Sequence, residues 1–164
     1  MGCGECTACC TVLGVKALQK DDYTPCQHCT GTGCGIYTAR PAECRTYECL
    51  QLHGKPEHRP DRLGVILEAT DVTLGGHRAN AVVVREVWPG ASEQEHAQAL
   101  VHSVAYQFDA FIYVVRKDGS RSAIFPPWAE HLRPYAQQIV ERSWRDRKKD
   151  LKARRKELKR RRRA

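Results

Sequence analysis

The sequence lacks several features that define large classes of protein. No apolar run approaches the roughly 20 residues that cross a bilayer, and the N-terminus has no basic stretch followed by an apolar one, so we expect a cytoplasmic protein without a transmembrane segment. Glycine-rich motifs for dinucleotides and nucleotide phosphates are absent, as is the G-x-S-x-G motif of serine hydrolases. No catalytic residue is indicated by a motif.

Cysteine and charge are both missing from large parts of the chain. All nine cysteines lie between Cys3 and Cys49, which leaves none in the last 115 of 164 residues. Residues 142–164 hold 14 lysines and arginines against three acidic residues, a net charge of +11. Because the whole chain carries +8, residues 1–141 sum to −3. Two distinctive ends therefore flank an ordinary middle part.

The composition divides the chain into four parts. Residues 1–50 are rich in cysteine and glycine and poor in aliphatic side chains, so they cannot bury enough apolar surface to fold alone, and metal coordination is the available source of stability. Residues 51–62 are polar, contain two prolines and read as a linker. We expect a small α+β domain over 63–141 and a basic tail over 142–164.

Two β-hairpins and two helices are predicted in the middle part. Valine- and isoleucine-rich runs at 63–67 and 81–87 flank a turn at Gly75-Gly76, and runs at 111–115 and 122–125 flank a turn at 117–120. Apolar residues at helical spacing follow a capping box that starts at Ser92, and a second helical face runs from Trp128 to Ile139. Strands joined by short turns predict a small antiparallel sheet with two helices.

The basic tail is predicted to be a helix, with two alternative roles. One apolar residue per heptad is too few for a coiled coil, which favours a solvated helix. The alternative is an electrostatic arm for nucleic acid, because its cations can displace counterions from phosphates. An anionic membrane surface or an acidic protein partner would satisfy the same charge.

The cysteine spacing is the strongest signal in the sequence. Thiols stay reduced in the cytosol, and C-x2-C pairs place two thiolates within reach of one ion, so the cysteines read as metal ligands. Arg40 and Arg45 flank one of them and would offset the negative charge of a thiolate centre. The candidate ligands are Cys3, Cys6, Cys9, Cys10, Cys26, Cys29, Cys34, Cys44 and Cys49.

The identity of the metal and the number of centres stay open at this point. The run C-x2-C-x2-C is similar to the start of a ferredoxin motif, and with the surplus of cysteines it favours an iron-sulfur cluster, 4Fe-4S above others, over zinc. In an extended segment Cys9 and Cys10 would point to opposite faces and serve two centres, unless one is spare. His28 is either a ligand, a donor to a sulfur, or an exposed loop residue.

Several of these elements, taken in order, resemble the YkgJ-like cysteine-cluster family. The matching pieces are CGECTACC at 3–10, PC at 25–26, GCGIYTARPAECR at 33–45 and RPDRLGVIL at 59–67. The family is described as a zinc- or iron-chelating CxxCxxCC domain, and a related cluster occurs in flagellin lysine N-methylases. The resemblance implies a metal-binding protein. The role that we expect is redox or electron transfer, sensing, or support of a protein modification.

The resemblance also implies which cysteines bind the metal. It makes Cys29 an extra thiol and Cys49 either an additional ligand or an inert thiol, and it gives Tyr37 a packing role over the site. The implied ligand set is Cys3, Cys6, Cys9, Cys10, Cys26, Cys34 and Cys44.

The alternative function is a nucleic-acid-binding module. In it, structural zinc stabilises the N-terminus and the basic tail binds RNA or DNA.

Overall fold

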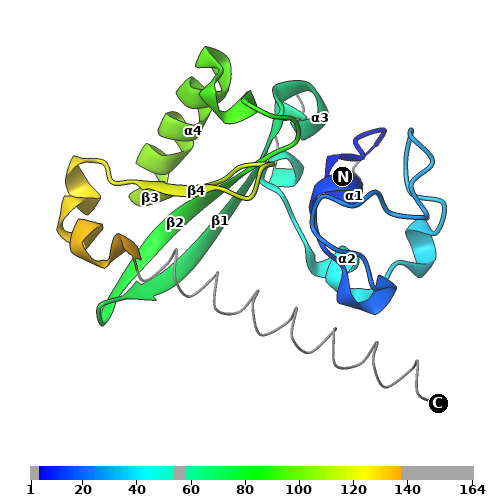
Figure 1. Cartoon of the computed structure of the whole chain (residues 1–164), viewed down its shortest axis with the longest axis horizontal. Coiled ribbons are helices and arrows are strands. Elements are labelled where there is room, and N and C mark those ends of the chain that lie inside the picture. The colour runs from blue at the N-terminus through cyan, green and yellow to red at the C-terminus, as the bar shows by residue number, and fades with distance from the viewer. Residues whose placement is uncertain (1–3, 54–57, 138–164) are drawn as a thin grey trace.

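The structure is a computed structural model that describes residues 4–53 and 58–137 (Figure 1). A four-stranded sheet with helices on both sides forms one part, and a cysteine-rich segment built of short helices and loops lies against it. This confirms an α+β fold with a cysteine-rich N-terminal region. The basic tail and its predicted helix lie outside the described residues.

The sheet has the strand order β1-β2-β3-β4 and is mixed. Strands β1 (Val65–Leu74) and β2 (His77–Glu86) are antiparallel around the predicted Gly75-Gly76 turn, and β3 (Ala110–Val115) and β4 (Arg121–Ile124) are antiparallel around the predicted second turn. The central pair β2-β3 is parallel. The predicted all-antiparallel sheet is therefore wrong at its centre, because a helix-length connection returns the chain to the same end of the sheet.

That connection is α4 (Glu95–Gln107), which covers one face of the sheet. Its buried side chains pack on residues that alternate along β1, β2 and β3. The cluster comprises Val65, Leu67, Val82, Val84, Ala91, Ala97, Val101, Val104, Ala105, Ala110, Ile112 and Val114. Since β3 is buried along its whole length, its continuous apolar run agrees with a strand covered on both faces.

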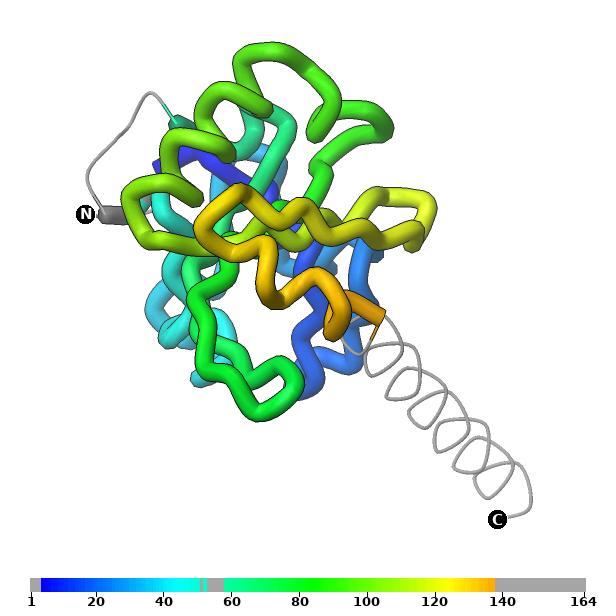
Figure 2. The backbone as a smooth tube through the Cα atoms, turned by 90° about the vertical axis from the view of Figure 1, so that its left-hand side faces the viewer, coloured from blue at the N-terminus to red at the C-terminus, as the bar shows by residue number. Residues whose placement is uncertain are grey.

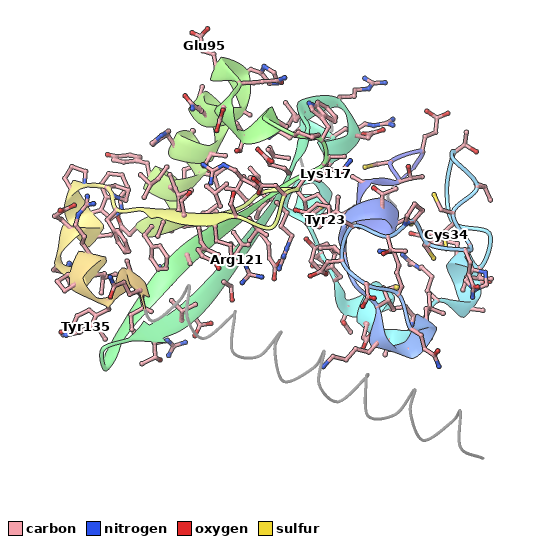
Figure 3. The ribbon with its side chains drawn as sticks, in the orientation of Figure 1. Tyr23, Cys34, Glu95, Lys117, Arg121 and Tyr135 are labelled. Carbon is pink, nitrogen blue, oxygen red and sulfur yellow. The ribbon has the colours of Figure 1, made fainter. Side chains whose placement is uncertain are left out.

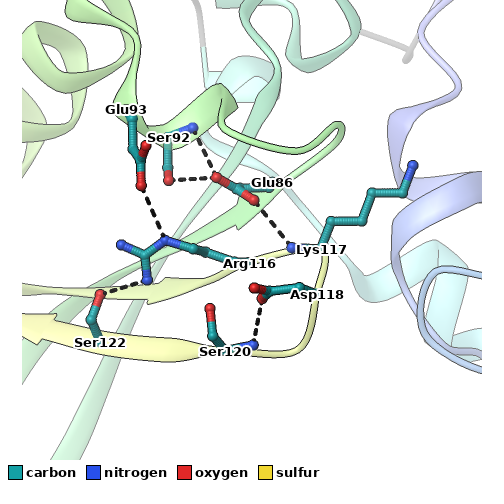
Figure 4. Close-up of polar contacts among 8 residues, drawn as sticks. All are labelled: Glu86, Ser92, Glu93, Arg116, Lys117, Asp118, Ser120 and Ser122. Carbon is teal, nitrogen blue, oxygen red and sulfur yellow. Dashed lines mark hydrogen bonds and ion pairs between the residues drawn. The ribbon is translucent and has the colours of Figure 1, made fainter.

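The predicted capping box is wrong, since α4 begins at Glu95 and no side chain caps it. Ser92 instead lies in a 3₁₀ turn, η5 (Ala91–Glu93), and its hydroxyl donates to the carboxylate of buried Glu86 at 2.6 Å (Figure 4). The backbone N–H groups of Ser92 and Lys117 donate to the same carboxylate at 3.2 and 3.1 Å. Glu86 thus joins the end of β2 to η5 and to the β3-β4 turn.

The opposite face carries two neighbours. The first is η6 (Pro127–Tyr135), a 3₁₀ helix with Pro134 inside it where an α-helix was predicted; in Figure 2 it lies in orange on the near side of the sheet. Ile139, the end of the predicted helical face, lies outside the described residues. Residues of the sheet and of η6 form a second apolar cluster on this face. Its buried residues are Leu74, Ala81, Phe111, Tyr113, Val115, Phe125, Ala129 and Leu132.

The second neighbour is the cysteine-rich segment. It is held against β1 by a small apolar cluster of Cys6, Ala8, Val12 and Ile66, and the Tyr23 hydroxyl donates to the Val115 carbonyl at 3.3 Å. Its short helices, with those that lead into the sheet, are α1 (Ala8–Val12), η1 (Lys16–Leu18), η2 (Tyr37–Ala39), α2 (Ala42–Thr46), η3 (Leu50–His53) and α3 (Pro60–Leu63). The last two fall partly within the range predicted as a linker.

Candidate metal centre

Most cysteines of the N-terminal segment line one cavity of about 140 Å³. Of the eight cysteines that the structure describes, Cys29 is the one that does not line it, and Cys3 lies outside the described residues. Figure 3 shows the sulfurs gathered in this segment around Cys34. The lining cysteines are Cys6, Cys9, Cys10, Cys26, Cys34, Cys44 and Cys49.

The first wall of the cavity is α1. Cys9 and Cys10 are in this helix, and both line the cavity, so the expectation that they point to opposite sides of an extended segment is wrong. Neighbouring residues of a helix differ by roughly 100°, which lets both thiols border one space. The Cys26 N–H donates to the Cys10 carbonyl at 2.9 Å and brings the second wall beside the first.

The second wall is a small hairpin around 26–35. Cys29 and Cys34 form an antiparallel bridge in it, the Thr30 N–H donates to the Gly33 carbonyl at 3.0 Å, and the Gly35 N–H donates to the His28 carbonyl at 2.8 Å. Cys34 lines the cavity and its bridge partner Cys29 does not. His28 does not line it either, and its ring contacts the Gln27 amide at 3.2 Å.

The third wall follows the second along the chain. Cys44 is in α2, a helix that begins directly after Pro41, and Cys49 directly precedes η3. The Arg40 guanidinium lies 3.7 Å from the centre of the Tyr37 ring, and both residues line the cavity. Pro60 and Ile66 complete the lining from α3 and β1, so the sheet supplies part of the cavity's boundary.

Burial affects the protonation of two cavity thiols. It raises the pKa of Cys6 and of Cys44, and at Cys44 the neighbouring Cys10, Cys26 and Cys34 thiols raise it further while Arg40 lowers it. The expected compensating charge is thus present at Arg40, whereas Arg45 does not line the cavity.

Cys6 connects the cavity to the segment that contains Arg59 and Asp61. The Cys6 thiol is hydrogen-bonded to Asp61, whose carboxylate accepts two bonds from the Arg59 guanidinium at 3.0 and 2.6 Å. The Arg59 bonds are the main cause of the lowered pKa of Asp61. Backbone N–H groups of Ala8 and Asp61 favour the thiolate form of Cys6. A deprotonated Cys6 no longer donates to the Asp61 carboxylate, and these two N–H groups then stabilise its negative charge.

Lys20 is a functional candidate that sequence reasoning missed. It lines the cavity, is 6% exposed, and donates from Nζ to the Leu13 carbonyl and, at 3.4 Å, to the Asp21 carbonyl. Burial lowers its pKa, while Cys26, Asp22 and Cys10 act in the opposite direction. No sequence signal distinguishes this lysine, because it becomes buried only in the fold, where its backbone forms a bridge with Val15.

The donor set and the size of the cavity can be compared with what a metal requires. Among the described residues, no three His, Cys, Asp or Glu side chains are grouped closely enough to hold one ion. A cavity needs ~10–15 Å³ to hold one water-sized atom, so this one has room for a group of several atoms. Cysteine thiols are the donor type that both zinc sites and iron-sulfur clusters use.

The fold and the cavity define a class: an α+β protein with a cysteine-lined N-terminal cavity. Comparisons with protein-family models, curated proteins and solved structures find no match for this chain. The resemblance to the YkgJ-like family therefore rests on the quoted motifs alone. No helix in the described ranges has the length and apolar character needed to cross a membrane.

Proposed function

We propose that the chain is a metal-binding cysteine-cluster protein of the YkgJ-like type, with a thiolate-ligated centre in the N-terminal cavity. One observation carries the proposal: seven cysteines from separate short elements line the same space, and β1 closes part of it. The ligands are drawn from these seven and from Cys3.

An iron-sulfur cluster, 4Fe-4S above others, is favoured over zinc. The cavity has room for several atoms, and the preference rests on the C-x2-C-x2-C run and the surplus of cysteines. When bound, such a cluster would supply one-electron chemistry, which suits electron transfer, sensing or support of a protein modification. Lys20 and Arg40 would offset the charge of the thiolates, and the apolar walls would limit the access of water.

Anaerobic purification of the full chain tests the proposal. We expect a coloured protein with iron and acid-labile sulfide in equal amounts. A colourless protein with stoichiometric zinc and no sulfide would refute the iron-sulfur assignment and keep the metal-binding proposal. A protein without metal, which also fails to take up iron with sulfide or zinc, would refute both.

The hairpin around 26–35 provides a matched pair of variants. Cys34 and Cys29 are bridge partners in the same small hairpin. Of these two residues, Cys34 lines the cavity and Cys29 does not. C34A is expected to lower the metal content, and C29A is expected to leave it unchanged. Equal losses would show that the hairpin matters only as a structural unit, and the opposite ranking would show that the ligand set is misassigned.

A further inference from the structure

The Tyr47 hydroxyl is a buried polar atom at the cavity without a hydrogen-bond partner. In the described part of the chain, two buried side-chain polar atoms lack a partner, and they are Tyr47 Oη and Arg85 Nε. Such a group costs free energy because it has lost water and gained no replacement. A buried hydroxyl of this kind in a native structure calls for an explanation, and a missing ligand is one.

Tyr47 is held in place by its surroundings. It follows α2 with an extended backbone, its ring packs against the apolar cluster that contains Cys6 and Ile66, and it lines the thiol cavity. A phenol is protonated at neutral pH, so the Tyr47 hydroxyl is a hydrogen-bond donor.

Cys49 is the cavity thiol that shares the surroundings of this phenol. Tyr47 and Cys49 both line the cavity, and both pack against the apolar cluster that contains Cys6 and Ile66. Cys49 is also two residues along the chain from Tyr47, a spacing that places side chains on the same side of an extended segment. A thiol is a weak acceptor, whereas a metal-bound thiolate is a strong one, so the bond gains strength when the cavity is loaded.

We propose that Tyr47 is a positioning residue of the thiol cavity, whose hydroxyl donates a hydrogen bond to the Cys49 thiolate when a metal is bound, and that Cys49 belongs to the ligand set. This inference rests on the proposed metal-binding function. It gives a role to a cysteine outside the ligand set that the family resemblance implies. It also explains why a buried hydroxyl without a partner is retained beside a cavity of thiols.

The proposal predicts effects of opposite sign in Y47F. Without metal, removal of an unpaired buried hydroxyl relieves a cost, so we expect the metal-free protein to melt at least about 2 °C higher. With metal, a hydrogen bond to a charged acceptor is lost, so we expect about tenfold weaker binding. A tyrosine that serves only for packing would show no loss of metal affinity.

The test uses the metal-free full chain and Co²⁺ as the probe, titrated anaerobically. Affinity comes from competition with a chelator, and the sulfur-to-cobalt charge-transfer band reports the bonding of the thiolates. We expect Y47F to weaken binding and to shift this band. Y106F is the control for the substitution itself, since Tyr106 is 71% exposed on α4 and does not line the cavity, and it should match the wild type.

A double-mutant cycle with C49A identifies the acceptor. We expect C49A to weaken Co²⁺ binding and Y47F to cause no further loss in that background. Unchanged affinity in Y47F, or an equal loss with and without Cys49, would overturn the inference while leaving the metal-binding function intact. Absence of Co²⁺ binding by the wild type, together with the absence of purified metal, would overturn the proposed function and this inference with it.

Discussion

Replacement of Glu86 by alanine tests the account of how the sheet is held to its surrounding turns. The carboxylate is 1% exposed and accepts three hydrogen bonds, from the Ser92 hydroxyl, the Ser92 N–H and the Lys117 N–H, at 2.6, 3.2 and 3.1 Å. Each donor left unpaired in a partly buried site costs about 1–3 kcal/mol, less where water can reach it. We expect E86A to lower the free energy of unfolding by about 3–5 kcal/mol.

Urea denaturation followed by circular dichroism measures this change, and it corresponds to a fall of about 6–20 °C in melting temperature. Glu93 provides the control, because its side chain is 67% exposed and it pairs with Arg116 at 3.7 Å. E93A should cost less than about 0.5 kcal/mol. An E86A protein within about 1 kcal/mol of the wild type would refute the reasoning.

Three further predictions concern the backbone, pH and the basic tail. Gly64 has φ +77°, and a Cβ there would lie 2.5 Å from the Trp88 side chain, so G64A should lower the free energy of unfolding in urea by about 2–4 kcal/mol. G76A is the control, since Gly76 has φ +87° but open space around it, and it should lower the same free energy by about 1 kcal/mol. Hydrogen bonds from the Ser120 side chain and then from its N–H lower the pKa of Asp118. The stability difference between wild type and D118A should therefore be full at neutral pH and shrink as pH falls through that lowered pKa, and a difference that grows on acidification would contradict this. If the tail is a nucleic-acid arm, a chain that ends at Glu141 should bind single-stranded RNA or DNA more weakly at low salt, and equal affinities would remove that alternative.

Local sequence patterns predicted the pieces of the sheet but not its full topology. The Gly75-Gly76 turn and the turn after β3 were predictable, because short loops between β-branched runs leave few other pairings. The parallel pairing of β2 with β3 depends on how α4 packs, which is a long-range property. The cap at Ser92 failed for a similar reason, because Glu86, six residues earlier, takes its hydroxyl.

The candidate site shows the same division. Spacing and resemblance singled out the cysteines, and the structure places seven of them around one cavity, with Cys49 inside the set and Cys29 outside it. Whether these residues bind a metal stays a prediction. Lys20 and Tyr47 could not be found from sequence, since an ordinary lysine and tyrosine become unusual only when the fold buries their polar atoms.

The charges that line the cavity bear on the number of centres. Lys20 and Arg40 supply two positive charges and Glu43 one negative charge among the described lining residues. A four-thiolate zinc site or an oxidised 4Fe-4S cluster carries about −2 by formal counting, so the net charge of about +1 from these three residues would leave about −1. Two such centres would leave about −3 in a body that already sums to −3.

Burial of two of the cavity thiols points the same way. It raises the pKa of Cys6 and Cys44, so ionising either thiol costs free energy unless a metal ion compensates it. Within the proposed function, we therefore predict one four-thiolate centre and not two. Metal analysis of the anaerobic protein should then give about four iron atoms or about one zinc per chain, and twice those values would show that both halves of the thiol set bind metal.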